Sequence, residues 1–209
     1  MKPHNIMENS DIKYLDIFFS PIQINQLDLN IDSLIEFCYE MKRKDEKGSK
    51  ISNIGGWQSK NVVNEVHEEF TKLKIEVEKF ANEYHRELEF KETLQQKIGN
   101  IWTNINQKGD SNEYHVHPFS ALSGCFYMNA NTPIVFEHPY SDITTYYWGH
   151  NVVENWNIAN SGFWEINPIP NTLLIFPPWL RHKVVMNTED TDRISISFNT
   201  HLQEKDTNI

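Results

Sequence analysis

Arg193-Ile194-Ser195-Ile196-Ser197-Phe198-Asn199 alternates strictly between polar and apolar side chains. A period of two is typical of a β-strand with one polar and one apolar face. The three apolar residues of this stretch are therefore expected to face a hydrophobic core. The opposite face, which begins with an arginine, is expected to meet something polar.

Similar segments fill the chain from Lys97 onward. They are short, rich in β-branched and aromatic residues, and separated by turn residues. The expected strands cover residues 98–105, 122–129, 134–137, 163–166, 172–176, 182–186 and 193–200. Seven short strands after a helical region predict an α+β protein with an antiparallel sandwich or barrel, and a jelly roll is the preferred prediction.

The amino-terminal part of the chain is predicted to support this sheet. Residues 12–19 alternate loosely and suit a first strand, and apolar residues at helical spacing predict helices over 31–41 and 62–88. Residues 48–59, which contain Gly55-Gly56, are expected to form an ordered loop. We therefore expect a single domain, with a strand and helical support in 1–96, the jelly-roll core in 97–201 and a frayed polar tail in 202–209.

The composition excludes several classes of protein. The 209 residues include 19 Lys and Arg against 29 Asp and Glu, and the formal charge of −10 disfavours nucleic acid as a partner. No apolar run approaches the roughly 20 residues needed to span a bilayer, and residues 1–11 lack the apolar core of a signal peptide. Cys38 and Cys125 are too few for a disulfide framework. These features predict a soluble cytoplasmic protein that uses neither membrane nor nucleic acid.

Three histidines suggest a metal site. In an extended segment, His115 and His117 would lie on one face roughly 6 to 7 Å apart, close enough to bind one ion. The rigid stretch Pro177-Pro178-Trp179-Leu180-Arg181 delivers His182 to the start of a following strand, where it could act as a third ligand. On these residues alone, metal binding and purely structural histidines are equally good interpretations.

Arg193 shifts the balance toward a metal site that also binds a carboxylate. A guanidinium with hydroxyls beside it on the same strand face can bind a carboxylate through paired charge-assisted hydrogen bonds. The alternative is an edge strand whose polar face lies in water. That alternative fits less well, because the apolar residues 173–176 indicate that this part of the chain contributes to the core.

These motifs together resemble the Fe(II)- and 2-oxoglutarate-dependent oxygenases with a double-stranded β-helix core, and a group of uncharacterised enzymes among them that has a His-x-His-Pro motif. The resemblance covers about the carboxyl-terminal half of the chain. It rests on Trp102-Thr103-Asn104 and on residues 112–118 (NEYHVHP), 120–127 (SALSGCFY), 174–182 (LIFPPWLRH) and 193–199 (RISISFN), with residues 55–59 (GGWQS) upstream.

The resemblance implies roles for particular residues. His115 and His182 would bind iron, and Arg193 would bind the far carboxylate of 2-oxoglutarate with help from Ser195 or Ser197. Two further cosubstrate contacts are weaker expectations. Tyr127 could contact the same carboxylate or be a core aromatic residue, and Asn104 could contact the cosubstrate or hold a nearby turn.

His117 departs from the family pattern, because most members have Asp or Glu at this position. Three interpretations remain. The site could use three histidines, it could use two histidines and water, or a carboxylate such as Glu113 or Asp110 could complete it. The three-histidine site is preferred, because Glu113 precedes His115 in an order that the family does not use.

The implied activity is that of an Fe(II)- and 2-oxoglutarate-dependent dioxygenase that hydroxylates its substrate and releases succinate and CO2. The substrate is expected to be a small molecule or a peptide, and a homodimer is left open. Residues 140–164 are predicted either to cover the iron as a lid or to form an extra hairpin on the barrel. Two alternative functions are a cupin-like metal-binding protein that does not use 2-oxoglutarate and a noncatalytic jelly-roll binding module.

Overall fold

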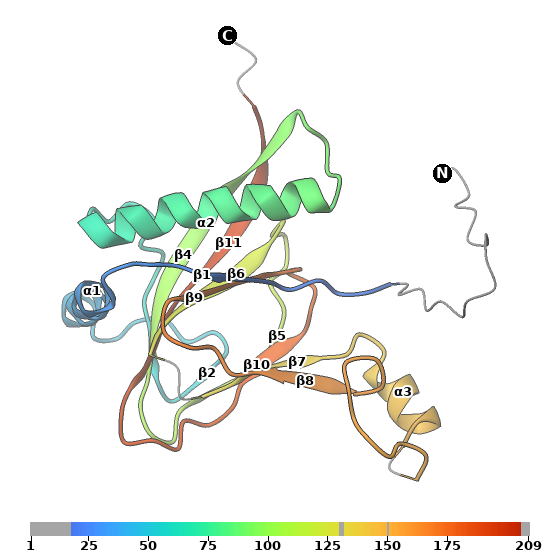
Figure 1. Cartoon of the computed structure of the whole chain (residues 1–209). Coiled ribbons are helices and arrows are strands. Elements are labelled where there is room, and N and C mark those ends of the chain that lie inside the picture. The colour runs from blue at the N-terminus through green and yellow to red at the C-terminus, as the bar shows by residue number, and fades with distance from the viewer. Residues whose placement is uncertain (1–17, 130–131, 150, 206–209) are drawn as a thin grey trace.

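Two antiparallel sheets and three helices make up the computed structural model, which describes residues 18–129, 132–149 and 151–205 (Figure 1). The helices are α1 (Ile31–Lys44), α2 (Glu68–Glu87) and α3 (Ser141–Tyr147). The larger sheet has the order β1-β9-β6-β11-β4-β3 and the smaller sheet has the order β2-β5-β10-β7-β8. This arrangement confirms the predicted α+β class.

The strands are numbered in chain order. They are β1 (Gln23–Gln26), β2 (Asn53–Ile54), β3 (Trp57–Gln58), β4 (Leu94–Asn106), β5 (Ser111–His115), β6 (Ser123–Asn129), β7 (Ile134–Glu137), β8 (Phe163–Ile166), β9 (Thr172–Phe176), β10 (His182–Val184) and β11 (Arg193–Glu204).

The main hydrophobic core lies between the six-stranded sheet and the helices α1 and α2, with α2 running across the sheet (Figure 1). Ile196 and Phe198 of β11 are fully buried there, together with Leu73 and Val77 of α2. Because side chains alternate along a strand, burying these apolar residues turns the polar residues of β11 toward the space between the two sheets. The alternation thus decides which side chains can reach a site inside the barrel.

Local contacts decide where the two long helices begin. The Asn30 side chain caps α1 by accepting a hydrogen bond from Ser33 N at 3.1 Å. The second predicted helix was placed too early, because α2 begins only at Glu68. Val62 N instead donates to the carbonyl of Ile101 in β4 at 2.9 Å, so this segment is tied to the sheet edge and cannot continue a helix.

The strand predictions need several corrections. Four strands, β1, β2, β3 and β5, were not predicted, and β2 and β3 lie within the expected loop 48–59. The strand predicted over 182–186 ends at Val184. The chain does not fray at residue 202, because β11 continues to Glu204 in register with β4. Of the strand expected over 12–19, residues 12–17 lie outside the described part of the chain, and Phe18 and Phe19 are exposed and not in a strand.

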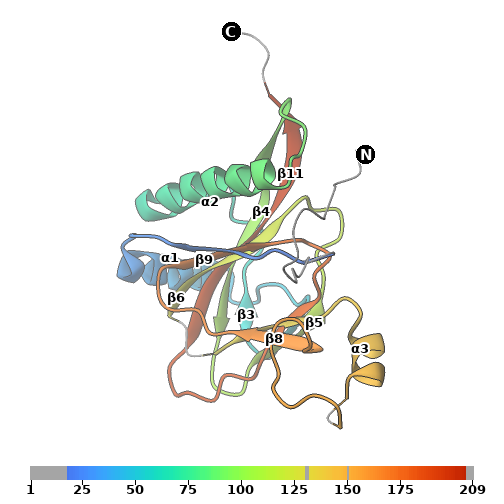
Figure 2. The same cartoon turned by 45° about the vertical axis from the view of Figure 1, so that its right-hand side comes forward.

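The described residues of 138–162 form an excursion between β7 and β8 at the edge of the five-stranded sheet. His138 N donates to the carbonyl of Gly162 at 2.9 Å, which closes the base of the excursion. Figures 1 and 2 show α3 projecting away from both sheets. The described part of the excursion contains the helix α3 and no strand pair of its own, so it differs from the predicted extra hairpin packed on the barrel.

Among the described residues, no helix combines the length and the apolar character that a membrane span requires.

Candidate functional site

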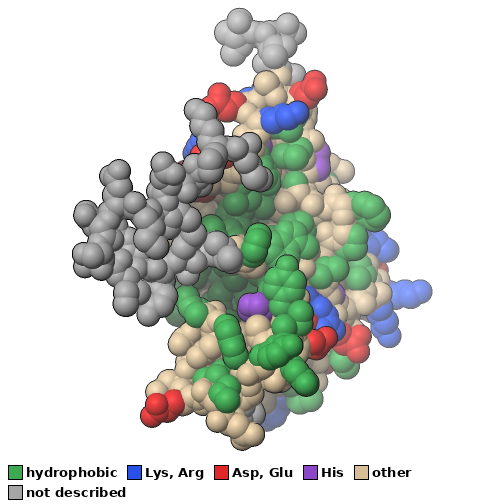
Figure 3. All heavy atoms as spheres, turned by 90° about the vertical axis from the view of Figure 1, so that its right-hand side faces the viewer, with side chains coloured by type: hydrophobic (Ala, Val, Ile, Leu, Met, Phe, Trp, Pro, Cys, Tyr) green, Lys and Arg blue, Asp and Glu red, His purple; other side chains and the backbone are tan. Residues whose placement is uncertain are grey.

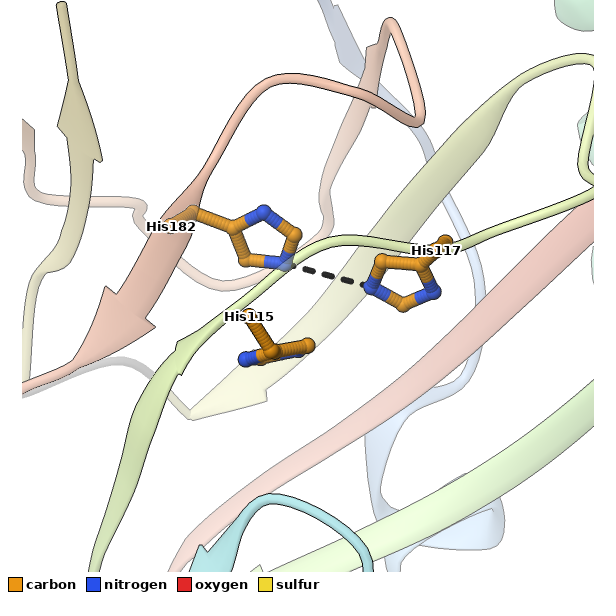
Figure 4. A group of neighbouring side chains, drawn as sticks. All are labelled: His115, His117 and His182. Atoms are coloured by element: carbon orange, nitrogen blue, oxygen red, sulfur yellow. Dashed lines mark hydrogen bonds between the residues drawn. The ribbon is translucent and has the colours of Figure 1, made fainter.

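Three histidines converge in the space between the sheets (Figure 4). His115, the last residue of β5, lies directly opposite His182, the first residue of β10. His117 follows just after β5 ends, so only His115 of the extended segment expected from the sequence lies in a strand. The backbone N of His117 donates to the carbonyl of Pro178 at 2.9 Å, which ties this loop to the Pro177-Pro178 turn. One nitrogen from each ring lies within 4.8 Å of the others.

Hydrogen bonds orient two of the rings. His115 Nδ1 lies 2.7 Å from the carbonyl oxygen of Glu113, and His182 Nδ1 lies 2.8 Å from the carbonyl oxygen of Leu180. A carbonyl can only accept, so each Nδ1 must carry the proton. Each Nε2 therefore keeps a lone pair, and His182 Nε2 faces His117 Nε2 at 3.2 Å.

The three imidazoles are held in their neutral form. Burial lowers the pKa of His117 to about 4 and that of His182 to about 3, with a smaller contribution from His115 in each case. Burial also lowers the pKa of His115. Neutral imidazoles are the form that binds a metal ion, so near pH 7 no proton has to be displaced from this cluster.

Arg193, at the start of β11, lines the same cavity and is almost completely buried, with 2% of its surface exposed. One terminal nitrogen donates to Ser195 Oγ at 3.3 Å, and the guanidinium lies 5.3 Å from the centre of the Tyr127 ring. The Nε of Arg193 and the hydroxyl of Tyr127 have no hydrogen-bond partner among the described residues. Burial raises the pKa of Tyr127 well above its usual value, so the hydroxyl stays a donor.

The two remaining predicted contacts are connected to each other. Asn104 in β4 donates to Ser197 Oγ at 3.0 Å, and the Ser197 hydroxyl in turn points to the sulfur of Cys125 at 3.5 Å. Asn104 therefore does not hold the turn that follows β4. Ser195 contacts the arginine, whereas the hydroxyl of Ser197 is already engaged.

All eight residues proposed from the sequence line one cavity of about 430 Å³. They are His115, His117, His182, Arg193, Ser195, Ser197, Tyr127 and Asn104. Figure 3 shows a hollow with hydrophobic side chains gathered around it, on the face of the molecule that carries α3.

No carboxylate is among the described side chains that line this cavity. Asp110 accepts a hydrogen bond from Gln107 N at 2.7 Å, and Glu113 is exposed, so neither reaches the histidine cluster. Residues 140–164 contribute nothing to the described lining either, so the predicted lid over the metal gains no support from this cavity.

Several lining residues were missed. Trp102 packs its ring against His117, with ring centres 5.7 Å apart and an angle of 23° between the planes. Asn199 ends the polar face of β11, and residues 58–61 form part of the wall. Trp102 could have been found, because it lies two residues before Asn104 and therefore on the same strand face.

The donor set fits a divalent metal and a dicarboxylate. Three neutral imidazoles that present adjacent nitrogens suit a first-row metal such as Fe(II). A buried guanidinium and a buried phenol with unused donors suit a carboxylate, which would supply the missing charge and acceptors.

Comparisons with known proteins agree with this geometry. Residues 100–199, just under half of the chain, match the sequence model of the family described as "Putative 2OG-Fe(II) oxygenase". No curated protein sequence matches the chain.

Three solved structures illustrate the likeness in fold. A prolyl-4-hydroxylase from Pseudomonas putida is 11% identical, with a TM-score of 0.58 over 86% of this chain and 91% of its own. The α-ketoglutarate-dependent carbocyclase SnoK from nogalamycin biosynthesis is 9% identical, with a TM-score of 0.63 over 87% and 79%. HygX from Streptomyces hygroscopicus, solved with nickel and 2-oxoglutarate bound, is 8% identical, with a TM-score of 0.55 over 87% and 82%. The predicted double-stranded β-helix fold is thereby confirmed.

Proposed function

We propose that this chain hydroxylates a substrate in a reaction dependent on Fe(II) and 2-oxoglutarate, because residues 100–199 match the sequence model of the 2OG-Fe(II) oxygenase family. The products from the cosubstrate are succinate and CO2. The identity of the substrate is left open, and both small molecules and peptide side chains fit this class of reaction.

The observation that carries the proposal is that one cavity contains both a histidine cluster able to bind a metal and a buried arginine able to bind a carboxylate. The histidine cluster directs ring nitrogens toward one another, and Arg193 is a buried cation with no carboxylate partner among the described residues. A buried charge is costly unless it is paired, so this arginine implies an anionic ligand. A ligand with a carboxylate at one end and metal-binding oxygens at the other satisfies both groups.

In this proposal His115, His117 and His182 are the metal ligands. We prefer three histidines over a two-histidine site, because His117 Nε2 is turned toward the cluster and Trp102 supports the ring in that position. The third interpretation needs a carboxylate, and neither Asp110 nor Glu113 lines the cavity.

Arg193, Tyr127 and Ser195 would bind the far carboxylate of 2-oxoglutarate. The guanidinium offers charge and Nε–H, and the phenol offers a hydroxyl that stays protonated. Asn104 and Ser197 would fix the shape of the wall beside the cosubstrate, because they hydrogen-bond each other. When bound together, Fe(II), 2-oxoglutarate and dioxygen supply the oxidation, in which one oxygen atom enters succinate and the other enters the substrate.

The alternative functions explain less. A metal-binding protein that does not use 2-oxoglutarate has no need of a buried arginine beside the metal. A noncatalytic binding module has no need of three neutral histidines whose ring nitrogens converge. The composition supports a cytoplasmic location without nucleic-acid partners, which we include in the proposal.

Anaerobic titration tests the proposal. Fe(II) and 2-oxoglutarate added together should give the visible charge-transfer band of the chelate, and admitting oxygen should then produce succinate.

Replacing Arg193 by Ala should weaken 2-oxoglutarate binding and leave metal binding intact. Arg181→Ala is the matched control, since Arg181 is exposed, pairs with Glu137 and does not line the cavity. Absence of both the band and succinate would reject the oxygenase function, and loss of metal binding in Arg193→Ala would make the arginine structural.

A further inference from the structure

The β7–β8 excursion carries much of the exposed apolar surface of the chain. Among the described residues, 24 large apolar side chains are exposed; eight of them belong to the excursion and two more belong to β8. None of these ten side chains is part of either hydrophobic core. No residue of α3 is buried, and Figures 1 and 2 show this helix projecting away from both sheets. The excursion therefore does not stabilise the chain that carries it through apolar burial.

The exposed area is large enough for a protein interface. Seven of the ten side chains are aromatic, and each of the ten exposes more than two fifths of its surface. An aromatic side chain has about 150–250 Å² to bury, so ten side chains exposed to this degree offer roughly 1,000 Å². One side of a standard protein–protein interface covers about 800 Å², whereas the largest apolar patch of a typical monomer is about 300–600 Å².

The composition of this segment favours an apolar partner. Asp142 and Glu154 are its only charged residues between positions 140 and 164, although 23% of the whole chain is charged. Charged residues are depleted and aromatic residues are enriched at the centre of protein interfaces. The segment therefore lacks the side chains with which it would recognise a charged partner.

β8 adds an open sheet edge to this surface. It is the last strand of the five-stranded sheet and pairs with β7 in a regular register. No other main-chain hydrogen bond in the described part of the chain involves Phe163–Ile166. Edge strands are usually protected by lysine, proline or a bulge, but β8 has none of these and exposes Phe163 and Trp164. Such an edge is suited to pairing with another strand.

We propose that the β7–β8 excursion and β8 form a homodimer interface, in which β8 of one copy pairs antiparallel with β8 of a second copy about a two-fold axis. Two identical strands that pair in this way offer each other the same main-chain groups, so one surface serves both partners. The projecting excursions pack their aromatic side chains against the opposite copy. A second copy supplies the apolar counterpart that the composition calls for. This inference does not rest on the proposed function.

The state of association tests the proposal. Interfaces of standard size have dissociation constants from µM to pM, so light scattering at about 10 µM should give twice the mass of one chain. Ile143→Lys combined with Tyr147→Lys should give a monomer at that concentration, because lysine is unfavourable at the centre of an interface. This variant should keep the native circular dichroism spectrum, since α3 buries no residue in the single chain.

Val66→Lys combined with Ile75→Lys is the matched control. It also adds two positive charges, and Ile75 on α2 is 62% exposed, against 58% for Ile143. Val66 is exposed as well. Both residues lie outside the proposed interface, so the control variant should remain a dimer.

Hydrogen exchange locates the contact. Main-chain N–H groups on the open edge of β8 should exchange more slowly as the protein concentration rises from below to above the dissociation constant, because pairing protects them. β1 provides an internal control, since it is an edge strand of the other sheet and its exchange should not depend on concentration.

Four outcomes would overturn the proposal. A native chain that is monomeric at every concentration would assign the surface to a different protein. A dimer that persists in the Ile143→Lys and Tyr147→Lys variant would place the interface elsewhere. An equal loss of the dimer in the control variant would mean that added charge, and not this surface, governs association. Exchange in β8 that is independent of concentration would exclude the strand pairing.

Discussion

Arg193 carries a free-energy cost in the protein without ligand. Its guanidinium is buried, and its Nε lacks a hydrogen-bond partner among the described residues. Replacing a buried charge by an apolar side chain of similar size is often stabilising, by about 1–4 kcal/mol. Binding groups of this kind are expected to be kept for function at the expense of stability.

Arg193→Met should therefore stabilise the ligand-free protein while abolishing 2-oxoglutarate binding. The expected gain is roughly 1–3 kcal/mol, because methionine fills much of the same space without a charge. Urea denaturation with and without 2-oxoglutarate measures both effects. A ligand-free variant less stable than the native protein would mean that the guanidinium is satisfied in the fold.

His117→Asp tests the unusual third ligand. An anionic ligand beside a divalent ion gains on the order of 4 kcal/mol of attraction per unit charge at an effective dielectric constant of 20, part of which desolvation offsets. We expect Co(II) to bind at least about tenfold more tightly, which corresponds to 1.4 kcal/mol. Isothermal titration measures the affinity. An unchanged affinity would place His117 outside the ligand set.

The sequence predicted those residues of the candidate site whose side-chain direction follows from the alternation along a strand. Arg193, Ser195 and Ser197 line the cavity because the apolar residues between them are buried against the helices. The acceptors that orient His115 and His182 were not predictable, because they are main-chain carbonyls and carry no residue-specific signal. The ligand and cosubstrate roles of these side chains remain predictions.

At the scale of elements, the strands that sequence reasoning found are those that bury apolar side chains. β7, β8 and β9 have the predicted bounds. β5 was missed because Ser111-Asn112-Glu113-Tyr114-His115 has no apolar alternation, and it forms only because β2 and β10 pair with it on either side. Tertiary pairing of this kind is not encoded in local hydrophobicity.

Gly124 allows β6 to pack inside the larger sheet. A Cβ at this position would collide with the Phe198 ring and with the main-chain carbonyl of Leu174. Gly124→Ala should cost about 1–3 kcal/mol or more of unfolding free energy, because the carbonyl belongs to a paired strand and cannot move aside. Gly149→Ala is the control, since the nearest atom, the carbonyl of Thr145, would lie at an ordinary 3.4 Å. Similar urea midpoints for the two variants would contradict the packing argument.

The β7–β8 excursion should be dispensable for binding metal and cosubstrate. Its described residues do not line the cavity, and the hydrogen bond from His138 N to Gly162 O closes its base. Replacing residues 139–161 by Asn-Gly, a pair that suits a tight hairpin, should leave the affinities for Co(II) and 2-oxoglutarate unchanged. Tyr127→Phe is the contrasting variant and should lose affinity for 2-oxoglutarate. A loss of either affinity in the shortened protein would contradict this prediction and would support the alternative that residues 140–164 cover the metal site as a lid.

At the scale of the whole molecule, the candidate site is divided between the two sheets. His115 and His182 belong to the five-stranded sheet, whereas Arg193 and Tyr127 belong to the six-stranded sheet. A cosubstrate that bridges a metal on one sheet to the arginine on the other would connect the two sheets across the barrel. Its binding should therefore stabilise the entire fold and not a single loop.

Thermal unfolding measures this connection. At a concentration of 100 Kd a ligand of the native state contributes about 2.7 kcal/mol, which is roughly 5–10 °C for a chain of this size. Mn(II) and 2-oxoglutarate together should raise the unfolding temperature by more than the sum of their separate effects, because each completes a binding site for the other, and EDTA should reverse the gain. In Arg193→Met the effect of Mn(II) should persist and the increment from 2-oxoglutarate should disappear. Strictly additive shifts in the native protein would mean that metal and cosubstrate occupy independent sites, and the bridge between the sheets would then be wrong.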